Sequence, residues 1–240
     1  MGKIYQVKRN GQIFNPESLY LFQSTHYFEE IVKIKNEFDR QNINYVFLKG
    51  LPLHLYFEKT HPKRIYLDCD VLVAPRDFDK AQKILFQLGY KKAQTELTPQ
   101  HEKLKDKQIE NAYYKIINGF SVVFDLHLEV VFMMTQLGRL EALYPQKLID
   151  RLTGEFLKTK RQVKINNEFF WILNTKYLIL YLALHFFHHN FGGGFRLAFL
   201  DRIIRKVCQS EFTWTSQPKI FKQVQDEILR YQLQNFLYPV

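Results

Sequence analysis

The sequence predicts an α+β protein in which a mixed sheet flanked by helices is followed by a mainly helical C-terminal domain. Two observations predict this class. The first half of the chain alternates short runs of β-branched and aliphatic residues with stretches of helical periodicity, which is typical of strands and helices packed on one another. From Gln136 onward the pattern is mainly helical. We therefore expect two domains, at residues 1–140 and 141–240.

The composition favours a basic globular protein with an anion-binding site. The chain has 240 residues, 46% of them hydrophobic, which suffices for one large domain or two small ones. Its 34 Lys and Arg exceed its 24 Asp and Glu, so the formal net charge is +10. A basic surface attracts nucleotides, nucleic acid or acidic membranes. Because the sequence has no long run of like charges and no RGG tract, we favour an anion site over a dedicated nucleic-acid binder.

The cysteines and apolar runs indicate a cytoplasmic protein. Cys69 and Cys208 lie in apolar patterns without CxxC spacing, which is typical of a reducing compartment. The longest apolar run, Tyr177 to Phe187, is interrupted by His185; it is too short to span a bilayer and fits a buried helix. The N-terminal residues lack the apolar block of a signal peptide. We therefore expect no membrane span.

Cap and turn residues set the predicted elements of the first half. Asn10-Gly11 predicts a hairpin turn, and Asn15-Pro16 predicts the start of a helix that runs to about Gln41. The polar face of this helix includes Glu30 and Lys35. The other predicted elements are a strand at 45–48 closed by Lys49-Gly50, a helix through Leu55 and Tyr56, a helix at 78–88 ended by Gly89, a loop or edge strand at 91–108, and strands at 112–117 and 121–131 joined at Asn118-Gly119.

Helices dominate the second half, where polar caps and glycines separate stretches of helical periodicity. Asn174 is an N-cap residue at the start of one such stretch. The predicted elements are a short strand at 163–165, a helix from Asn174 to His189, a break at Gly192-Gly193-Gly194, a helix at 195–207 and a last helix at 220–235.

The stretch from Arg64 to Val73 contains the first candidate site. It is predicted as a buried strand that stops at Pro75, yet Asp68 and Asp70 interrupt it. Side chains alternate along a strand, so the two carboxylates point the same way, roughly 7 Å apart at about 3.3 Å per residue. Like charges on one face of an apolar strand are unfavourable without a cation. Since carboxylate oxygens suit Mg²⁺, we predict a divalent metal site here.

A second set of polar residues interrupts the strand at 121–131. Asp125, His127 and Glu129 alternate with apolar residues, so we expect all three on one face. Such residues also fit the solvated face of a half-exposed strand, and this is our interpretation for Glu129. His127 is placed either to orient Asp125 or to contact a nucleotide.

The order of these motifs resembles the nucleotidyltransferase fold of the DNA polymerase β superfamily. There, a glycine turn leads to a helix beside the triphosphate, an Asp-x-Asp pair holds Mg²⁺, and a carboxylate on a later strand completes the metal site. Within that superfamily the chain is most similar to an uncharacterised nucleotidyltransferase family, over about residues 45–207. The matching motifs are Leu48-Lys49-Gly50, Arg64, Asp68 with Asp70, Asp125-Leu126-His127, His185 with His189, and Phe195-Arg196-Leu197 followed by Asp201.

The resemblance implies a metal-dependent nucleotidyltransferase that uses Mg²⁺ or Mn²⁺. Asp68, Asp70 and Asp125 are the implied catalytic residues and metal ligands, and Asp125 would also take or steer the proton of the acceptor hydroxyl. The expected reaction moves AMP from ATP, or another NMP from its NTP, to a hydroxyl of a small molecule, a protein or an RNA end. The expected nucleotide-binding residues are Lys49, Gly50, Arg64, His127 and Arg196.

One position departs from the superfamily pattern, and two other functions remain open. The glycine turn there is usually Gly-Gly or Gly-Ser, whereas Gly50 is followed by Leu51, so we expect Lys49 to replace the lost phosphate contact. The first alternative is a non-catalytic nucleotide- or RNA-binding regulatory module on the same fold. The second is a metal hydrolase built on Asp125, His127 and the paired histidines. The i, i+3, i+4 spacing of His185, His188 and His189 is compatible with zinc, although we favour a packing role for these side chains.

Overall fold

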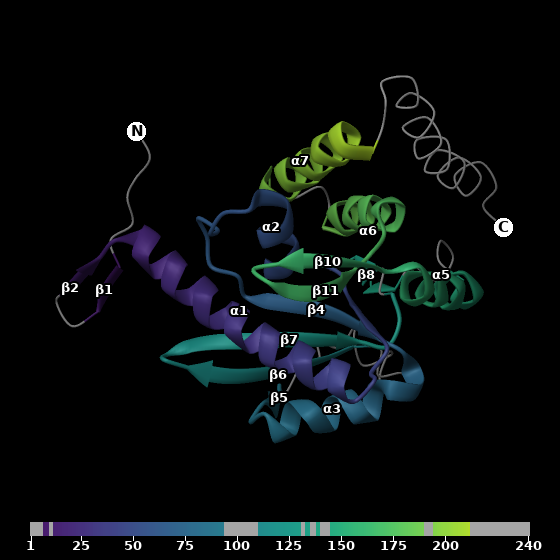
Figure 1. Cartoon of the computed structure of the whole chain (residues 1–240), viewed down its shortest axis with the longest axis horizontal. Coiled ribbons are helices and arrows are strands. Elements are labelled where there is room, and N and C mark those ends of the chain that lie inside the picture. Colours follow the sequence, from purple (N-terminus) through teal and green to yellow (C-terminus); the bar gives the residue numbers. More distant parts are fainter. Residues whose placement is uncertain are drawn as a thin grey trace. The chain divides into compact units, whose positions relative to one another are not determined.

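The structure is a computed structural model in which the chain forms two compact units. It describes residues 7–9, 12–93, 110–130, 133–134, 138–139, 145–189 and 194–211. The first unit comprises Met1–Glu96, Asp106–Glu129 and Lys160–Ile172, and the second comprises Leu97–Lys105, Val130–Thr159 and Leu173–Val240. Strands and helices are combined in a mixed sheet with flanking helices, so the predicted α+β class is confirmed (Figure 1).

A seven-stranded mixed sheet forms the centre of the first unit. Its strand order is β10-β11-β3-β4-β7-β6-β5. The pairs β4–β7 and β11–β3 are parallel, and the other neighbours are antiparallel. The strands are β3 (Tyr45–Phe47), β4 (Asp68–Val73), β5 (Lys91–Lys92), β6 (Glu110–Ile117), β7 (Phe120–His127), β10 (Arg161–Ile165) and β11 (Glu168–Ile172).

The cap residues predicted from the sequence start the helices as expected. The Asn15 side chain accepts a hydrogen bond from the Glu17 N–H, and Asn174 accepts one from the Tyr177 N–H. The hairpin predicted near Asn10-Gly11 is the pair β1 (Val7–Arg9) and β2 (Gln12–Phe14). The remaining elements are α1 (Pro16–Arg40), α2 (Leu51–Glu58), η1 (Pro75–Asp77), α3 (Phe78–Gln87), β8 (Met133–Met134), β9 (Gly138–Arg139), α5 (Gln146–Thr159), α6 (Thr175–His188) and α7 (Gly194–Glu211).

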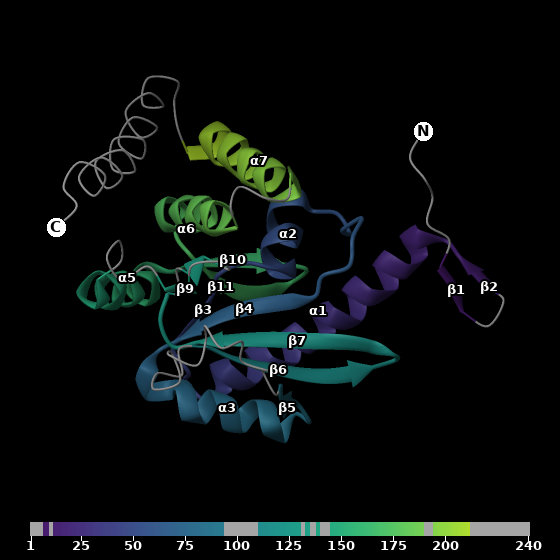
Figure 2. The ribbon, with the colours of Figure 1, turned by 180° about the vertical axis from the view of Figure 1, so that it is seen from behind.

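Helix α1 lies across one face of the sheet (Figures 1 and 2). Tyr27 of α1 is fully buried, its ring packs on Phe124 of β7 with 6.1 Å between centroids, and its hydroxyl donates to the Val123 carbonyl at 2.5 Å. Phe38 packs in the same way on Tyr45 of β3, at 5.2 Å. Because side chains alternate along a strand, the neighbours of Phe124 point to the opposite face of the sheet.

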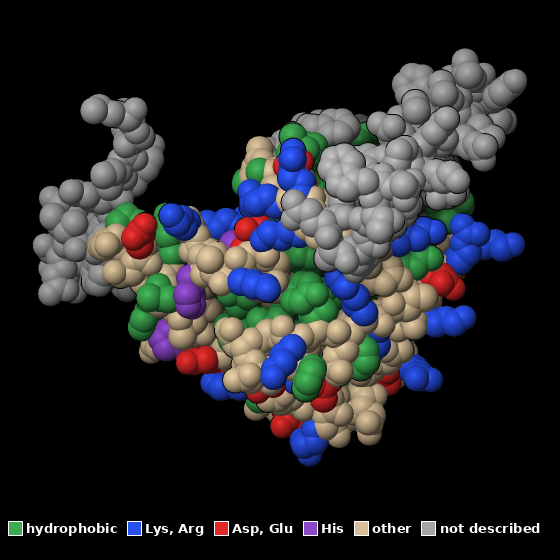
Figure 3. Space-filling model, turned by 45° about the horizontal axis from the view of Figure 1, so that its top comes forward, with side chains coloured by type: hydrophobic (Ala, Val, Ile, Leu, Met, Phe, Trp, Pro, Cys, Tyr) green, Lys and Arg blue, Asp and Glu red, His purple; other side chains and the backbone are tan. Residues whose placement is uncertain are grey.

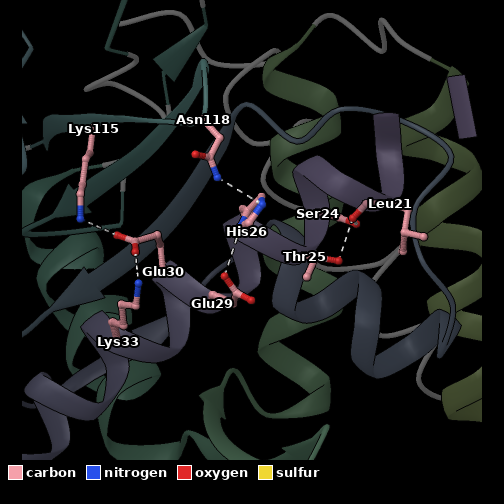
Figure 4. A network of polar contacts seen from close by, with 9 residues as sticks. All are labelled: Leu21, Ser24, Thr25, His26, Glu29, Glu30, Lys33, Lys115 and Asn118. Carbon is pink, nitrogen blue, oxygen red and sulfur yellow. Dashed lines mark hydrogen bonds and ion pairs between the residues drawn. The ribbon is translucent and has the colours of Figure 1, made fainter. Parts of the chain in front are cut away.

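Two charged residues of α1 are buried, although the sequence pattern predicted them on its solvated face. Glu30 is 3% exposed and Lys35 is 4% exposed. Glu30 accepts hydrogen bonds from Lys33 at 2.6 Å, Lys115 at 3.0 Å and Tyr90 at 3.1 Å, and Figure 4 shows the two lysines pointing at its carboxylate. Burial alone would raise the pKa of Glu30, but the lysine hydrogen bonds outweigh burial and hold this pKa below its usual value. The buried carboxylate therefore links α1 to β6.

Two strands have other bounds than predicted, and one strand was not predicted. Strand β4 begins at Asp68 rather than Arg64, because the Gln23 side chain of α1 bonds both the N–H and the carbonyl of Tyr66 in place of a neighbouring strand. Strand β7 ends at His127, so Glu129 lies beyond it. Strand β11 was not predicted; it forms a hairpin with β10 that joins the sheet through β3. The sheet therefore includes residues that follow the boundary predicted near residue 140.

Several predictions lie outside the residues that the structure describes. They are the last helix at 220–235, most of the glycine break at 192–194, and the segment 94–108 that follows β5. None of the helices within the described residues combines the length and the apolar character needed to cross a membrane.

Replacing Glu30 with Gln is expected to lower the free energy of unfolding by about 1–2 kcal/mol at neutral pH, because the charge-assisted hydrogen bonds are lost. The difference should be present above the pKa of an unfolded Glu, about 4.3. It should disappear as the pH falls through the lower folded-state pKa, where wild-type Glu30 is protonated too. Urea unfolding of both proteins across this pH range measures it.

The matched control is Glu29→Gln. Glu29 is 55% exposed and pairs with His26, as Figure 4 also shows, so its replacement should change stability by about 0.5 kcal/mol or less. A gap between wild type and Glu30→Gln that does not vary with pH would contradict the assigned role of Glu30.

Candidate functional site

Three carboxylates meet on the face of the sheet opposite α1. Strands β4 and β7 run parallel and side by side, with Asp70 in register with Asp125 and Asp68 in register with Val123. Because both strands alternate their side chains, Asp68, Asp70 and Asp125 point to the same side. One carboxylate oxygen from each lies within 4.8 Å of the other two. The structure thus brings together the three residues that the sequence suggested as metal ligands.

The three carboxylates differ in exposure. Asp70 is 3% exposed and forms the floor of the site, whereas the Asp68 side chain is 48% exposed and lies at its rim. Asp125 is intermediate. A ligand would therefore approach from the side of Asp68 and Asp125, with Asp70 beneath it.

The turn after β3 places a lysine against these carboxylates. Gly50 has φ +102°, and a Cβ at this position would lie 3.2 Å from the Asp68 carbonyl oxygen and 3.4 Å from Cys69 Cα. Only glycine combines this left-handed conformation with so close an approach to β4. The turn is also fixed by the Leu48 N–H, which donates to the Asp70 carbonyl at 3.0 Å. Lys49 lies between Leu48 and Gly50, so its backbone is held beside the three carboxylates.

Lys49 and His127 both bind Asp70. The Lys49 Nζ lies 2.7 Å from Asp70 Oδ2 and 3.3 Å from Asp68 Oδ2. The His127 Nε2 lies 3.1 Å from Asp70 Oδ1, with 4% of the histidine exposed. Sequence reasoning placed Lys49 on phosphate and His127 on Asp125 or a nucleotide, so the contacts with Asp70 were missed. The only sequence signal for the lysine contact was its position in the turn next to the Asp-x-Asp strand.

These contacts keep Asp70 ionised. Burial would raise the pKa of this carboxyl, but the attraction of the Lys49 ammonium and the hydrogen bond from His127 outweigh burial and lower its pKa to about 2. Asp70 therefore carries its charge at neutral pH beside Asp68 and Asp125. Carboxylates that lie this close together attract a cation.

The donor set fits Mg²⁺ or Mn²⁺. Carboxylate oxygens are the ligands these ions prefer, and octahedral Mg²⁺ at about 2.1 Å per ligand spans about 4.2 Å between opposite oxygens. The spacing of up to 4.8 Å between the three oxygens is close to this span, and a small side-chain rotation would close the difference. Asp68 and Asp125, which are less buried than Asp70, have the room to rotate.

The histidines of α6 do not form a second metal site among the described residues, where the three Asp are the one group of carboxylate, imidazole and thiol side chains arranged to hold an ion. The rings of His185 and His189 are in edge contact at 4.4 Å between centroids, and His188 Nδ1 lies 2.5 Å from the Leu184 carbonyl. These contacts fit the packing role that the sequence favoured. The zinc-hydrolase hypothesis has no donor set in this part of the chain.

The departure at Leu51 does not obstruct the site. Leu51 is fully buried, so its side chain packs into the core. Pro52 at the start of α2 has no N–H, so this helix offers a phosphate one donor fewer than a helix without proline there. Lys49 adds positive charge beside the carboxylates.

The other candidate residues, Arg64, Arg196 and Glu129, belong to segments other than strands β4 and β7. Arg64 precedes β4, and its guanidinium lies 4.2 Å from the Tyr66 ring centroid. Arg196 belongs to the second unit, where it lies 4.7 Å from the Phe195 ring, and its role in phosphate binding stays a prediction. Glu129 is 9% exposed, so the expectation that it faces solvent is wrong. It lies past the end of β7, where the alternation of the strand no longer applies.

Comparisons with known proteins give one family match and one distant structural likeness. The model of a family described as "Uncharacterised nucleotidyltransferase" matches residues 8–238. A solved structure described as an antigenic nucleotidyltransferase-like protein from Paracoccidioides brasiliensis is similar over 91% of this chain and 90% of that chain, with 13% sequence identity and a TM-score of 0.46. No curated protein matches the chain. The family match includes all three carboxylates.

Replacing Gly50 with Ala is expected to destabilise the protein more than replacing Gly89 with Ala. Both glycines have positive φ, +102° and +85°, so each alanine should cost about 1–2 kcal/mol from backbone strain. At Gly89 the nearest atom to the added Cβ is the flexible Lys115 side chain at 3.8 Å, whereas at Gly50 it is the β4 backbone. Urea unfolding midpoints measure the difference. Equal midpoints for the two variants would contradict the close approach of the Gly50 turn to the β4 backbone.

Proposed function

The chain belongs to the uncharacterised nucleotidyltransferase family, and we propose that it transfers an NMP group from an NTP, with ATP as the first candidate, to a hydroxyl group. The observation that carries this proposal is the cluster of Asp68, Asp70 and Asp125 on one face of the sheet. Three carboxylates that converge on one point, beside a lysine, suit a metal-dependent displacement at a phosphorus of a polyphosphate.

We assign the metal to the three carboxylates. Asp70 would be the fixed ligand, because it is buried and held by Lys49 and His127. Asp68 and Asp125 would complete the site from its more exposed side. When bound, Mg²⁺ would neutralise phosphate charge and lower the pKa of the attacking hydroxyl.

These positions support the following reaction. The acceptor oxygen forms a bond with the α-phosphorus, the bond from that phosphorus to the bridging oxygen breaks, and pyrophosphate leaves. Asp125 is the candidate base for the acceptor proton, since it is less buried than Asp70 and in register with it on the neighbouring strand. Lys49 and Arg64 would bind the phosphates, and Arg196 is kept as a candidate phosphate ligand on its sequence motif alone.

The charge of the chain agrees with an anionic substrate but does not select the acceptor. The net charge is +10, and on the face drawn in Figure 3 the Lys and Arg side chains lie at many separate points. Scattered positive charge of this kind raises the local concentration of nucleotides without favouring one shape of partner. A small molecule, a protein side chain and an RNA end are the acceptor classes to compare.

Replacing Asp70 with Asn should reduce pyrophosphate release from labelled NTP in the presence of Mg²⁺ by on the order of 10²–10³-fold, the range seen when one preorganised electrostatic group is removed. The assay supplies each NTP in turn, with a mixture of candidate acceptors, and detects labelled pyrophosphate. Asp125→Asn should show a loss of similar size.

The control is Asp79→Asn, which removes an exposed carboxylate of α3 and should leave the rate unchanged. Equal rates for wild type and Asp70→Asn would refute the proposed site. If wild type binds Mg²⁺ and nucleotide but releases no pyrophosphate with any acceptor class, the chain is instead a nucleotide-binding module.

A further inference from the structure

Lys49 lies between two candidate metal ligands, Asp68 and Asp70, and its position links the binding of metal to the binding of nucleotide. We propose that Lys49 is the internal counterion of the carboxylate site, and that it yields its place to a divalent metal only when the phosphates of a nucleotide arrive to pair with it. This inference rests on the proposed function. It assigns to one residue the coupling between metal binding and nucleotide binding.

The lysine and the metal compete for the same carboxylate oxygens. Asp70 has two carboxylate oxygens, and both have a partner: Oδ1 lies 3.1 Å from His127 and Oδ2 lies 2.7 Å from Lys49. Asp68 contributes Oδ2 to the same ammonium at 3.3 Å. A metal that binds Asp68 and Asp70 would therefore compete with Lys49 for these oxygens.

The backbone of Lys49 is held close to the three carboxylates. Its backbone is fixed between the Leu48 hydrogen bond to β4 and the close approach of Gly50 to the Asp68 carbonyl. A divalent ion bound to the carboxylates would lie close to this ammonium, and like charges at short range in a partly buried site repel strongly. Metal alone is therefore disfavoured as long as Lys49 stays on the carboxylates.

The exposed rim of the site, at Asp68, offers a place where the phosphates of a nucleotide could bind Lys49. The Lys49 side chain is 19% exposed, and its Asp68 partner at the rim is 48% exposed. A short movement of the flexible side chain toward the rim takes the ammonium to solvent, where a triphosphate would approach. The triphosphate would pair with Lys49 at this edge, where Pro52 of α2 has no N–H to donate.

Coupling of this kind is reciprocal. If nucleotide releases Lys49 from the carboxylates, nucleotide must raise the affinity for metal by the same factor by which metal raises the affinity for nucleotide. Removing the lysine charge should uncouple the two events: free metal should bind more tightly, and the gain from adding nucleotide should shrink.

The test is a Mn²⁺ titration of the full chain, followed by electron paramagnetic resonance, with and without a non-hydrolysable ATP analogue. Lys49→Met should bind Mn²⁺ alone about tenfold more tightly than wild type, within the range of roughly 5–150-fold typical of coupled sites. In wild type the analogue should increase Mn²⁺ affinity by a larger factor than in Lys49→Met. Lys49→Arg, which keeps the charge, should behave like wild type.

Lys83→Met is the matched control, because it removes an exposed lysine of α3 and should leave Mn²⁺ binding unchanged. Circular dichroism of each variant establishes that it is folded, and Lys49→Gln serves if Lys49→Met is not. Equal Mn²⁺ affinities of wild type and the uncharged Lys49 variants would overturn the counterion role while leaving the proposed function intact. No Mn²⁺ binding by any variant, even with the analogue, would overturn the proposed function as well.

Discussion

The parallel, in-register pairing of β4 with β7 is the constraint on which the site depends. It sets Asp70 directly beside Asp125, and the alternation of β4 adds Asp68 on the same face. Three carboxylates so close together repel one another, so the structure must supply positive charge and hydrogen bonds. Lys49 and His127 do so at Asp70, the most buried of the three. The site is thus an anionic cluster held together by its own partners and suited to a cation.

The opposite face of the sheet gives these side chains a rigid support. Tyr27 of α1 packs on Phe124, which precedes Asp125 in β7, and bonds the carbonyl of Val123, which is in register with Asp68 of β4. Glu30 ties the same helix to β6 through Lys115. Since α1 is linked to the strands by buried polar contacts as well as by apolar packing, the strands that carry the Asp residues have little freedom to move. A preorganised site needs such a scaffold.

Local patterns predicted most elements and the Asp68/Asp70 pair, because alternation, caps and turns act within a few residues, whereas the role of Asp125 as a third ligand came from the family resemblance. Asn15, Asn118-Gly119 and the Asp-x-Asp strand are examples. Long-range partners were not predictable: Gln23 shortens β4 from 43 residues away, and Glu30 is buried because Lys115 and Tyr90 reach it. The contact between Lys49 and Asp70 was missed for the same reason.

The central claim is that Asp68, Asp70 and Asp125 together hold the metal of a nucleotide. The most direct measurement is a crystal structure of the chain with Mn²⁺ and a non-hydrolysable ATP analogue, with the ion located by its anomalous scattering. We expect one or two Mn²⁺ ions ligated by all three carboxylates, with the phosphates of the analogue at Lys49. Nucleotide bound at another place, or Mn²⁺ bound without these carboxylates, would contradict it.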